Sequence, residues 1–134
     1  MNELTIEATI ENMDAVLDFV RAHIEDCPPK IKNKIAIAVD EVFSNIAHYA
    51  YRSNCPEARD VTVRVMAGDP ITIAFEDSGA PYDPLAKDDP DISLSAEERD
   101  IGGLGIFMVK NIMDSVEYRR EGNKNILTIK KELE

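Results

Sequence analysis

One stretch of the chain, residues 30–51, repeats its apolar side chains with the period of an amphipathic helix. These side chains recur every three or four positions, at Ile31, Ile35, Val39, Val42, Ile46 and Ala50. A helix with one apolar stripe is stable only when that stripe is buried against another layer of structure. The run therefore predicts a long helix that packs on a second layer.

Two further segments also have helical spacing. The first starts near Asn12 and ends before Pro28-Pro29, and its stripe is Met13, Val16, Leu17, Val20 and Ile24. The second is the apolar run 106–113, which follows a cluster of glycines. Proline removes a backbone donor and stops the first helix. Three helices are predicted in total.

Other segments alternate apolar and polar side chains, which is typical of strands with one buried face. Gly68-Asp69-Pro70 and Gly122-Asn123 separate two pairs of these segments, and both are favourable turn sequences. The expected strands are residues 4–10, 61–66, 71–75, 115–120 and 125–133.

The order of these elements predicts the fold class. Consecutive strands interrupted by helices favour an α+β fold, a two-layer sandwich of a mixed, mainly antiparallel sheet with three helices on one face. With 134 residues, the chain is expected to form a single domain over residues 1–134. Residues from about 80 to 101 are rich in Pro, Asp and Ser, and a connection of this length between ordered elements is interpreted as a lid.

Charge narrows the classes of partner. The net charge is −11, from 26 acidic and 15 basic residues, so nucleic-acid binding is disfavoured. No segment approaches the roughly 20 apolar residues of a membrane helix, and the N-terminus does not resemble a signal peptide. The two cysteines have no metal-binding spacing. A cytoplasmic protein without membrane contact is expected.

Glu41 and Asn45 lie four residues apart on the long helix and therefore on one face. An asparagine carbonyl oxygen can ligate Mg²⁺, and a nearby carboxylate can accept a proton from a nucleophile. From the spacing alone, an ordinary solvated pair is the favoured interpretation, because the pattern Glu-x-x-x-Asn occurs freely in helices.

Asp77-Ser78-Gly79 directly follows an apolar strand. A buried aspartate there could accept a hydrogen bond from the exocyclic amine of adenine, and Gly79 would allow the base to approach closely. A turn in which the aspartate caps local amides remains the alternative.

The segment Gly102-Gly103-Leu104-Gly105 precedes the third helix, where backbone N–H groups can meet phosphates. It lacks the Gly-Lys-Ser/Thr of a P-loop, and a glycine hinge is the alternative interpretation. Arg99, just before it, could reach a terminal phosphate, and so could Lys110.

In order and separation, residues 37–45, 77–84 and 102–106 resemble the three ATP-binding motifs of the GHKL ATPase superfamily. That superfamily includes gyrase, the Hsp90 chaperones, histidine kinases and MutL, and its anti-sigma factor serine/threonine kinases are the most similar group. The resemblance implies the histidine kinase-like (Bergerat-type) ATP-binding fold. The chain departs from the wider pattern at Ala80-Pro81 and at His48-Tyr49.

The resemblance also implies roles for individual residues. Asn45 would ligate Mg²⁺, Glu41 would be the general base, and Asp77 would recognise adenine. From its position in the lid, Arg99 is expected to stabilise the phosphoryl group beside them. The segments that border ATP would include Gly79, Gly103, Leu104 and Gly105.

By the same resemblance, the chain is expected to be a serine/threonine protein kinase that phosphorylates a small anti-sigma factor antagonist and regulates by partner switching. The implied partners are that antagonist, a sigma factor and a second copy of the chain in a homodimer. The alternative is a non-catalytic module in which ATP only controls the affinity for a protein partner.

Overall fold

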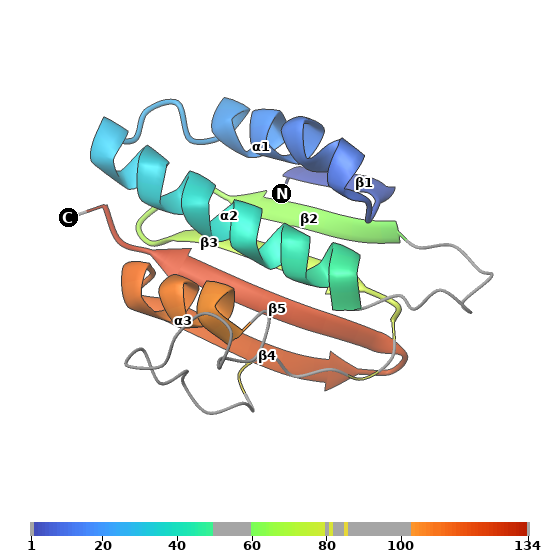
Figure 1. Ribbon diagram of the computed structural model, residues 1–134. Coiled ribbons are helices and arrows are strands. Elements are labelled where there is room, and N and C mark those ends of the chain that lie inside the picture. The colour runs from blue at the N-terminus through green and yellow to red at the C-terminus, as the bar shows by residue number, and fades with distance from the viewer. Residues whose placement is uncertain (1, 50–59, 80, 82–84, 86–102, 134) are drawn as a thin grey trace.

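The computed structural model describes residues 2–49, 60–79, 81, 85 and 103–133 (Figure 1). Its elements follow the order expected from the sequence, with a short 3-10 helix, Ile10–Asn12, added after the first strand. The strands and helices are β1 (Asn2–Glu7), α1 (Met13–Ala22), α2 (Pro29–Tyr49), β2 (Asp60–Met66), β3 (Ile71–Asp77), α3 (Gly103–Ile112), β4 (Ser115–Glu121) and β5 (Lys124–Lys131).

The five strands form one sheet in the order β1-β2-β3-β5-β4. All four neighbouring pairs are antiparallel, which confirms the prediction of a mainly antiparallel sheet. Both predicted hairpins are present, and Gly122 in the second turn has a φ of 62°, a conformation that side chains with a β-carbon rarely adopt. β5, the last strand in sequence, lies between β3 and β4 and so joins the two hairpins.

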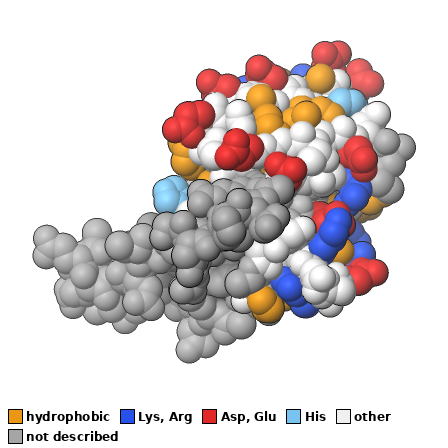
Figure 2. All heavy atoms as spheres, turned by 90° about the vertical axis from the view of Figure 1, so that its right-hand side faces the viewer, with side chains coloured by type: hydrophobic (Ala, Val, Ile, Leu, Met, Phe, Trp, Pro, Cys, Tyr) orange, Lys and Arg blue, Asp and Glu red, His pale blue; other side chains and the backbone are white. Residues whose placement is uncertain are grey.

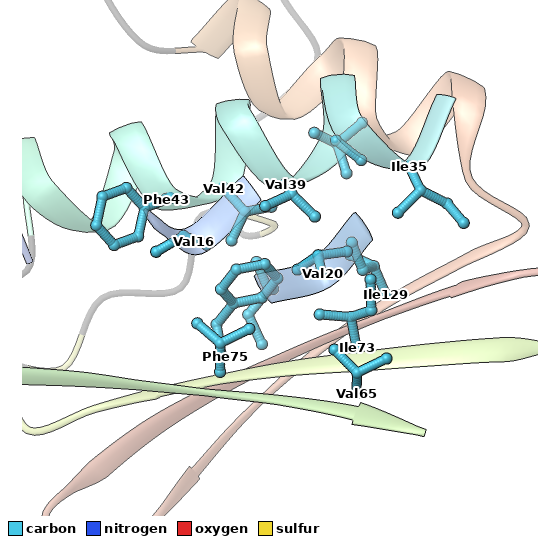
Figure 3. Close-up of a cluster of buried hydrophobic side chains, with 14 of the residues drawn as sticks. Val16, Val20, Ile35, Val39, Val42, Phe43, Val65, Ile73, Phe75 and Ile129 are labelled. Atoms are coloured by element: carbon cyan, nitrogen blue, oxygen red, sulfur yellow. The ribbon is translucent and has the colours of Figure 1, made fainter. Parts of the chain in front are cut away.

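The three helices cover one face of this sheet, as predicted (Figure 1). Alternate residues of the strands point toward the helices and form the core with the helical stripes. Figure 3 shows Phe43 of α2 and Phe75 of β3 toward one end of the core, and Ile35 and Ile73 toward the other. All four side chains are almost completely buried. The result is a two-layer α+β sandwich.

The first strand is shorter than its sequence pattern predicted. It ends at Glu7, and Ile10 is 46% exposed in the 3-10 helix although the alternation placed it on the buried side. The Asn12 side chain donates a hydrogen bond to the Glu7 carbonyl at 2.8 Å, and the Thr9 amide donates to the same oxygen at 2.9 Å. These local bonds turn the chain into α1 before the strand can continue.

Helix α3 starts at Gly103, three residues earlier than the apolar run suggested, so Gly103 and Gly105 are helical. Glycine is a poor helix former, and its propensity argued for a loop here. In the structure α3 packs against α2, and Gly105 in its first turn lies beside Glu41.

The predicted lid, residues 80 to 101, lies outside the described residues except for Pro81 and Leu85. Within the described segments, no helix has the length and apolar character needed to cross a membrane.

Candidate functional site

A row of polar side chains crosses three strands at one end of the sheet. Asp77 of β3 pairs in register with Asn125 of β5, and Asn125 pairs with Arg120 of β4. Because cross-strand partners point to the same face, all three side chains belong to the helix-covered side. The apolar core therefore ends at this row.

Asp77 is buried, with 6% of the residue exposed. Its Oδ1 atom accepts hydrogen bonds from Asn125 Nδ2 and from the Gly79 amide, both at 2.9 Å. Oδ2 accepts none from the part of the chain that the structure describes. One carboxylate oxygen is thus fixed, and the other is available to a ligand.

The pKa of Asp77 is raised because burial disfavours the charged carboxylate. Hydrogen bonds from Asn125 and Gly79, together with the positive charge of Arg120, act in the opposite direction and favour ionisation. These three groups limit the cost of keeping a negative charge in an otherwise apolar environment.

Gly79 joins the same network through its carbonyl oxygen. Arg120 Nη1 donates to this oxygen at 2.8 Å, and Asn125 Nδ2 approaches it at 3.5 Å. Side chains of β4 and β5 therefore hold both ends of the turn that follows β3.

Glu41 lies at a different part of the site, where α2 faces the first turn of α3. A β-carbon added at Gly105 would overlap Glu41 Oε2, so glycine is what allows the carboxylate to occupy this position. Burial, and then the charge of Asp40, raise the pKa of Glu41. A carboxylate with a raised pKa is a better proton acceptor at neutral pH.

Asn45 follows Glu41 by one helical turn and is 9% exposed. It is the only polar residue among the buried residues that the structure describes in α2. An amide side chain at this position can present its oxygen to a ligand.

α2 and β3 end on the same side of the molecule (Figure 1), and Figure 2 looks onto that side. Lys and Arg side chains gather in its lower half, although the chain as a whole is strongly acidic. Part of this charge is compensated, because Arg119 pairs with Glu121 and Lys124 pairs with Glu76.

The structure thus brings the predicted residues together in two groups. Glu41 meets Gly105 with Asn45 one turn away, and Asp77 is bonded to Gly79. Gly103 and Leu104 open α3, and Lys110 lies in its last turn. Arg99 falls outside the described residues.

The sequence reasoning missed Asn125, Arg120 and Tyr118. A signal was present, because Asn125 occupies an inward position of a strand whose next inward residues are Leu127 and Ile129. A polar residue in a core position requires partners.

No group of three or more His, Cys, Asp or Glu side chains within the described segments could hold a metal ion. Mg²⁺ in nucleotide sites is usually held by one or two protein oxygens with phosphates and water. A single amide such as Asn45 is compatible with that donor set.

Comparison with known proteins identifies the family. The histidine kinase-like ATPase domain model matches residues 6–131. The serine/threonine-protein kinase BtrW of Bordetella bronchiseptica is 26% identical, over 75% of this chain and 70% of that protein. An anti-sigma F factor of Clostridium perfringens is 29% identical, over 97% of this chain and 95% of that protein.

Solved structures agree at the level of the fold. The RsbU and RsbW domains of Rv1364c from Mycobacterium tuberculosis superpose with a TM-score of 0.66 at 14% identity, over 99% of this chain and 32% of that one. The fold and the family expected from the three sequence motifs are confirmed. The chain belongs to the histidine kinase-like ATPase domain family.

Proposed function

We propose that the chain is an ATP-dependent serine/threonine protein kinase of the anti-sigma factor type. The observation that carries the proposal is the Glu41 carboxylate, which lies against the first turn of α3 with a raised pKa and with Asn45 one turn away. The names of the relatives support it, because they include serine/threonine-protein kinases and anti-sigma factors.

In this proposal ATP lies between the two groups of residues. Asp77 Oδ2 accepts a hydrogen bond from the adenine amine, and Gly79 allows the base to approach. The start of α3, with Gly103, Leu104 and Gly105, faces the phosphates, because the N-terminal end of a helix favours anions. Arg99 remains a predicted partner of the terminal phosphate.

Asn45 is the proposed protein ligand of Mg²⁺, through its side-chain oxygen. When bound, the ion neutralises charge that develops on the phosphate oxygens. Asn45 is well placed to position such an ion because its helix is held rigidly by the buried stripe of α2.

The proposed chemistry is transfer of the γ-phosphoryl group to a serine or threonine hydroxyl. Glu41 accepts the hydroxyl proton, a bond forms between the hydroxyl oxygen and the γ-phosphorus, and the bond to the β–γ bridging oxygen breaks to release ADP. The proposed substrate is a small anti-sigma factor antagonist, whose phosphorylation state then decides which partner the kinase binds.

Transfer of labelled phosphate from ATP to purified antagonist proteins of the same organism tests this function. Glu41→Gln should abolish transfer and leave ATP affinity within about twofold, because the amide keeps the shape and loses the basicity. Glu25→Gln, which makes the same change at an exposed residue between α1 and α2, should transfer phosphate normally.

Two outcomes would contradict the kinase proposal. Absence of transfer by the unchanged protein to every antagonist, despite ATP binding, would contradict it directly. In the second outcome, neither protein transfers phosphate, and ATP changes the affinity for the partner identically in the unchanged protein and in Glu41→Gln. This result would instead support a nucleotide-gated binding module.

Assembly and location complete the proposal. A homodimer in the cytoplasm, with a sigma factor as a further partner, remains a prediction from the resemblance. Sedimentation analysis should give about twice the chain mass of 15.0 kDa, and a concentration-independent monomer would contradict the homodimer.

A further inference from the structure

Arg120 and Tyr118 of β4 converge on a single atom, the side-chain oxygen of Asn125. Arg120 Nη1 donates to this oxygen at 3.1 Å and the Tyr118 hydroxyl donates at 2.5 Å. On its other side, the Asn125 amide nitrogen donates to Asp77 Oδ1. Asn125 is 5% exposed, so these protein groups replace water around it.

This arrangement fixes the orientation of the Asn125 amide. Its oxygen faces two donors and its nitrogen faces two acceptors, Asp77 Oδ1 and the Gly79 carbonyl. A flipped amide would place its NH₂ group against the donors and its oxygen against the carboxylate. The two β4 side chains therefore determine which atom Asn125 presents to Asp77.

The same contacts determine the orientation of Asp77. Asn125 and the Gly79 amide both bind Oδ1, so the carboxylate plane is set with Oδ2 directed away from them. Arg120 secures the second anchor as well, because it binds the Gly79 carbonyl at 2.8 Å. One guanidinium thus restrains both groups that hold the carboxylate.

We infer that Arg120, with Tyr118, is a positioning residue for base recognition, which acts through Asn125 and Gly79 to aim Asp77 Oδ2 at a 6-amino group on the purine. The inference rests on the proposed nucleotide site and adds to it the source of discrimination between adenine and 6-oxopurines. A fixed acceptor favours the amine of adenine and disfavours the carbonyl oxygen of a 6-oxopurine.

Calorimetric titration of the protein with ATP and with inosine triphosphate (ITP) tests the inference by comparing the two affinities. ITP carries an oxygen in place of the 6-amino group. The unchanged protein should bind ATP more tightly than ITP. Arg120→Gln should weaken ATP binding about tenfold and change ITP binding by less than about twofold, because the lost free energy belongs to one hydrogen bond to a charged group.

A matched control is the neighbouring residue. Arg119→Gln removes the same charge from a side chain that is 69% exposed and pairs only with Glu121 among the described residues. It should leave the ratio of ATP to ITP affinity unchanged. Tyr118→Phe removes only one donor to Asn125 and should lower the ratio by a smaller factor, about threefold.

The outcomes separate the inference from the proposed function. If the unchanged protein binds neither nucleotide, the proposed site itself is wrong. If it prefers ATP and Arg120→Gln weakens ATP and ITP equally, or affects neither, the positioning role is wrong and the nucleotide site stands. Arg120→Lys, which keeps the charge and loses the planar fork, should recover only part of the ratio.

Discussion

At the scale of single residues, Asp77 combines a cost in stability with a use in binding. Burial raises its pKa, so its folded value lies above its value in the unfolded chain. Such a carboxylate destabilises the folded state increasingly as the pH rises through the interval between the two values. The ionised form of Asp77 is therefore the form that the fold alone does not favour.

Asp77→Asn should separate these two effects. The new amide oxygen can still accept the bonds from Asn125 and Gly79, while an NH₂ group replaces Oδ2. ATP affinity should fall at least tenfold, and the free energy of unfolding without nucleotide at pH 7 should stay the same or rise. Calorimetric titration and urea denaturation measure the two quantities, and an unchanged ATP affinity would contradict the adenine-recognition role of Asp77.

Gly105 is the second residue with a sharply defined role. Alanine is the better helix former by about 1 kcal/mol, but its methyl group would overlap Glu41 Oε2 and displace the carboxylate. Gly105→Ala should therefore lower the rate of phosphotransfer by about a hundredfold, with no loss of thermal stability.

The double variant Gly105→Ala/Glu41→Gln shows whether Gly105 acts through Glu41. Once Glu41 has been replaced, the added methyl group should cause little further loss in transfer rate. Fully multiplicative losses would mean that Gly105 contributes in some other way.

At the scale of elements, the uncovered face of the sheet carries a network of charged side chains. Glu76 of β3 binds Arg64 of β2, at 3.2 Å through Nη1, and Lys124 of β5, at 3.0 Å. Burial would raise the pKa of Glu76, but its hydrogen bonds to Arg64 and Lys124 outweigh that effect and lower it. The network links three neighbouring strands.

Glu76→Gln should lower the free energy of unfolding at pH 7 by about 1–2 kcal/mol, as measured by urea denaturation. Because the folded pKa is below the unfolded value, the stabilisation is present above about pH 4.3 and is lost as the pH falls through the folded pKa. The variant should thus lose less stability than the unchanged protein on acidification. Glu3→Gln, which removes the more exposed partner of Arg64, should cost less than about 0.5 kcal/mol at pH 7.

The elements were predictable from the sequence wherever periodicity alone determined them. The stripes of α1 and α2 and the alternation of β2 and β3 correspond directly to buried faces. The ends of elements were less predictable. Ile10 continued an alternating pattern that local hydrogen bonds interrupt. α3 begins among glycines, where the local sequence does not predict a helix.

At the scale of the whole molecule, the candidate site depends on contacts between distant segments. Glu41, Asn45 and Asp77 could be proposed from the sequence because each stands out within its own element, and their roles stay predictions. The inward position of Asn125 was visible in the sequence, but its partners were not, because they meet only when β5 inserts between β3 and β4. A single-residue pattern does not reveal such a sheet order.

Nucleotide binding should stabilise the molecule as a whole. A ligand that binds only the folded state adds about 2.7 kcal/mol of stability at a concentration one hundred times its dissociation constant. ATP with Mg²⁺ should therefore raise the thermal unfolding midpoint by several degrees, and ATP alone by less. An identical rise for Asp77→Asn would show that the nucleotide binds elsewhere.

The pairing of β4 with β5 also makes the length of their connecting turn a determinant of specificity. A one-residue insertion at Gly122-Asn123 would be harmless in most hairpins, since surface turns tolerate changes in length. Here an insertion could change the register between β4 and β5, in which Arg120 pairs with Asn125. If one strand shifted by one position against the other, its side chain, Arg120 or Asn125, would point to the opposite face of the sheet. Natural or engineered variants that differ only in the number of residues in this turn should therefore lose their preference among purines.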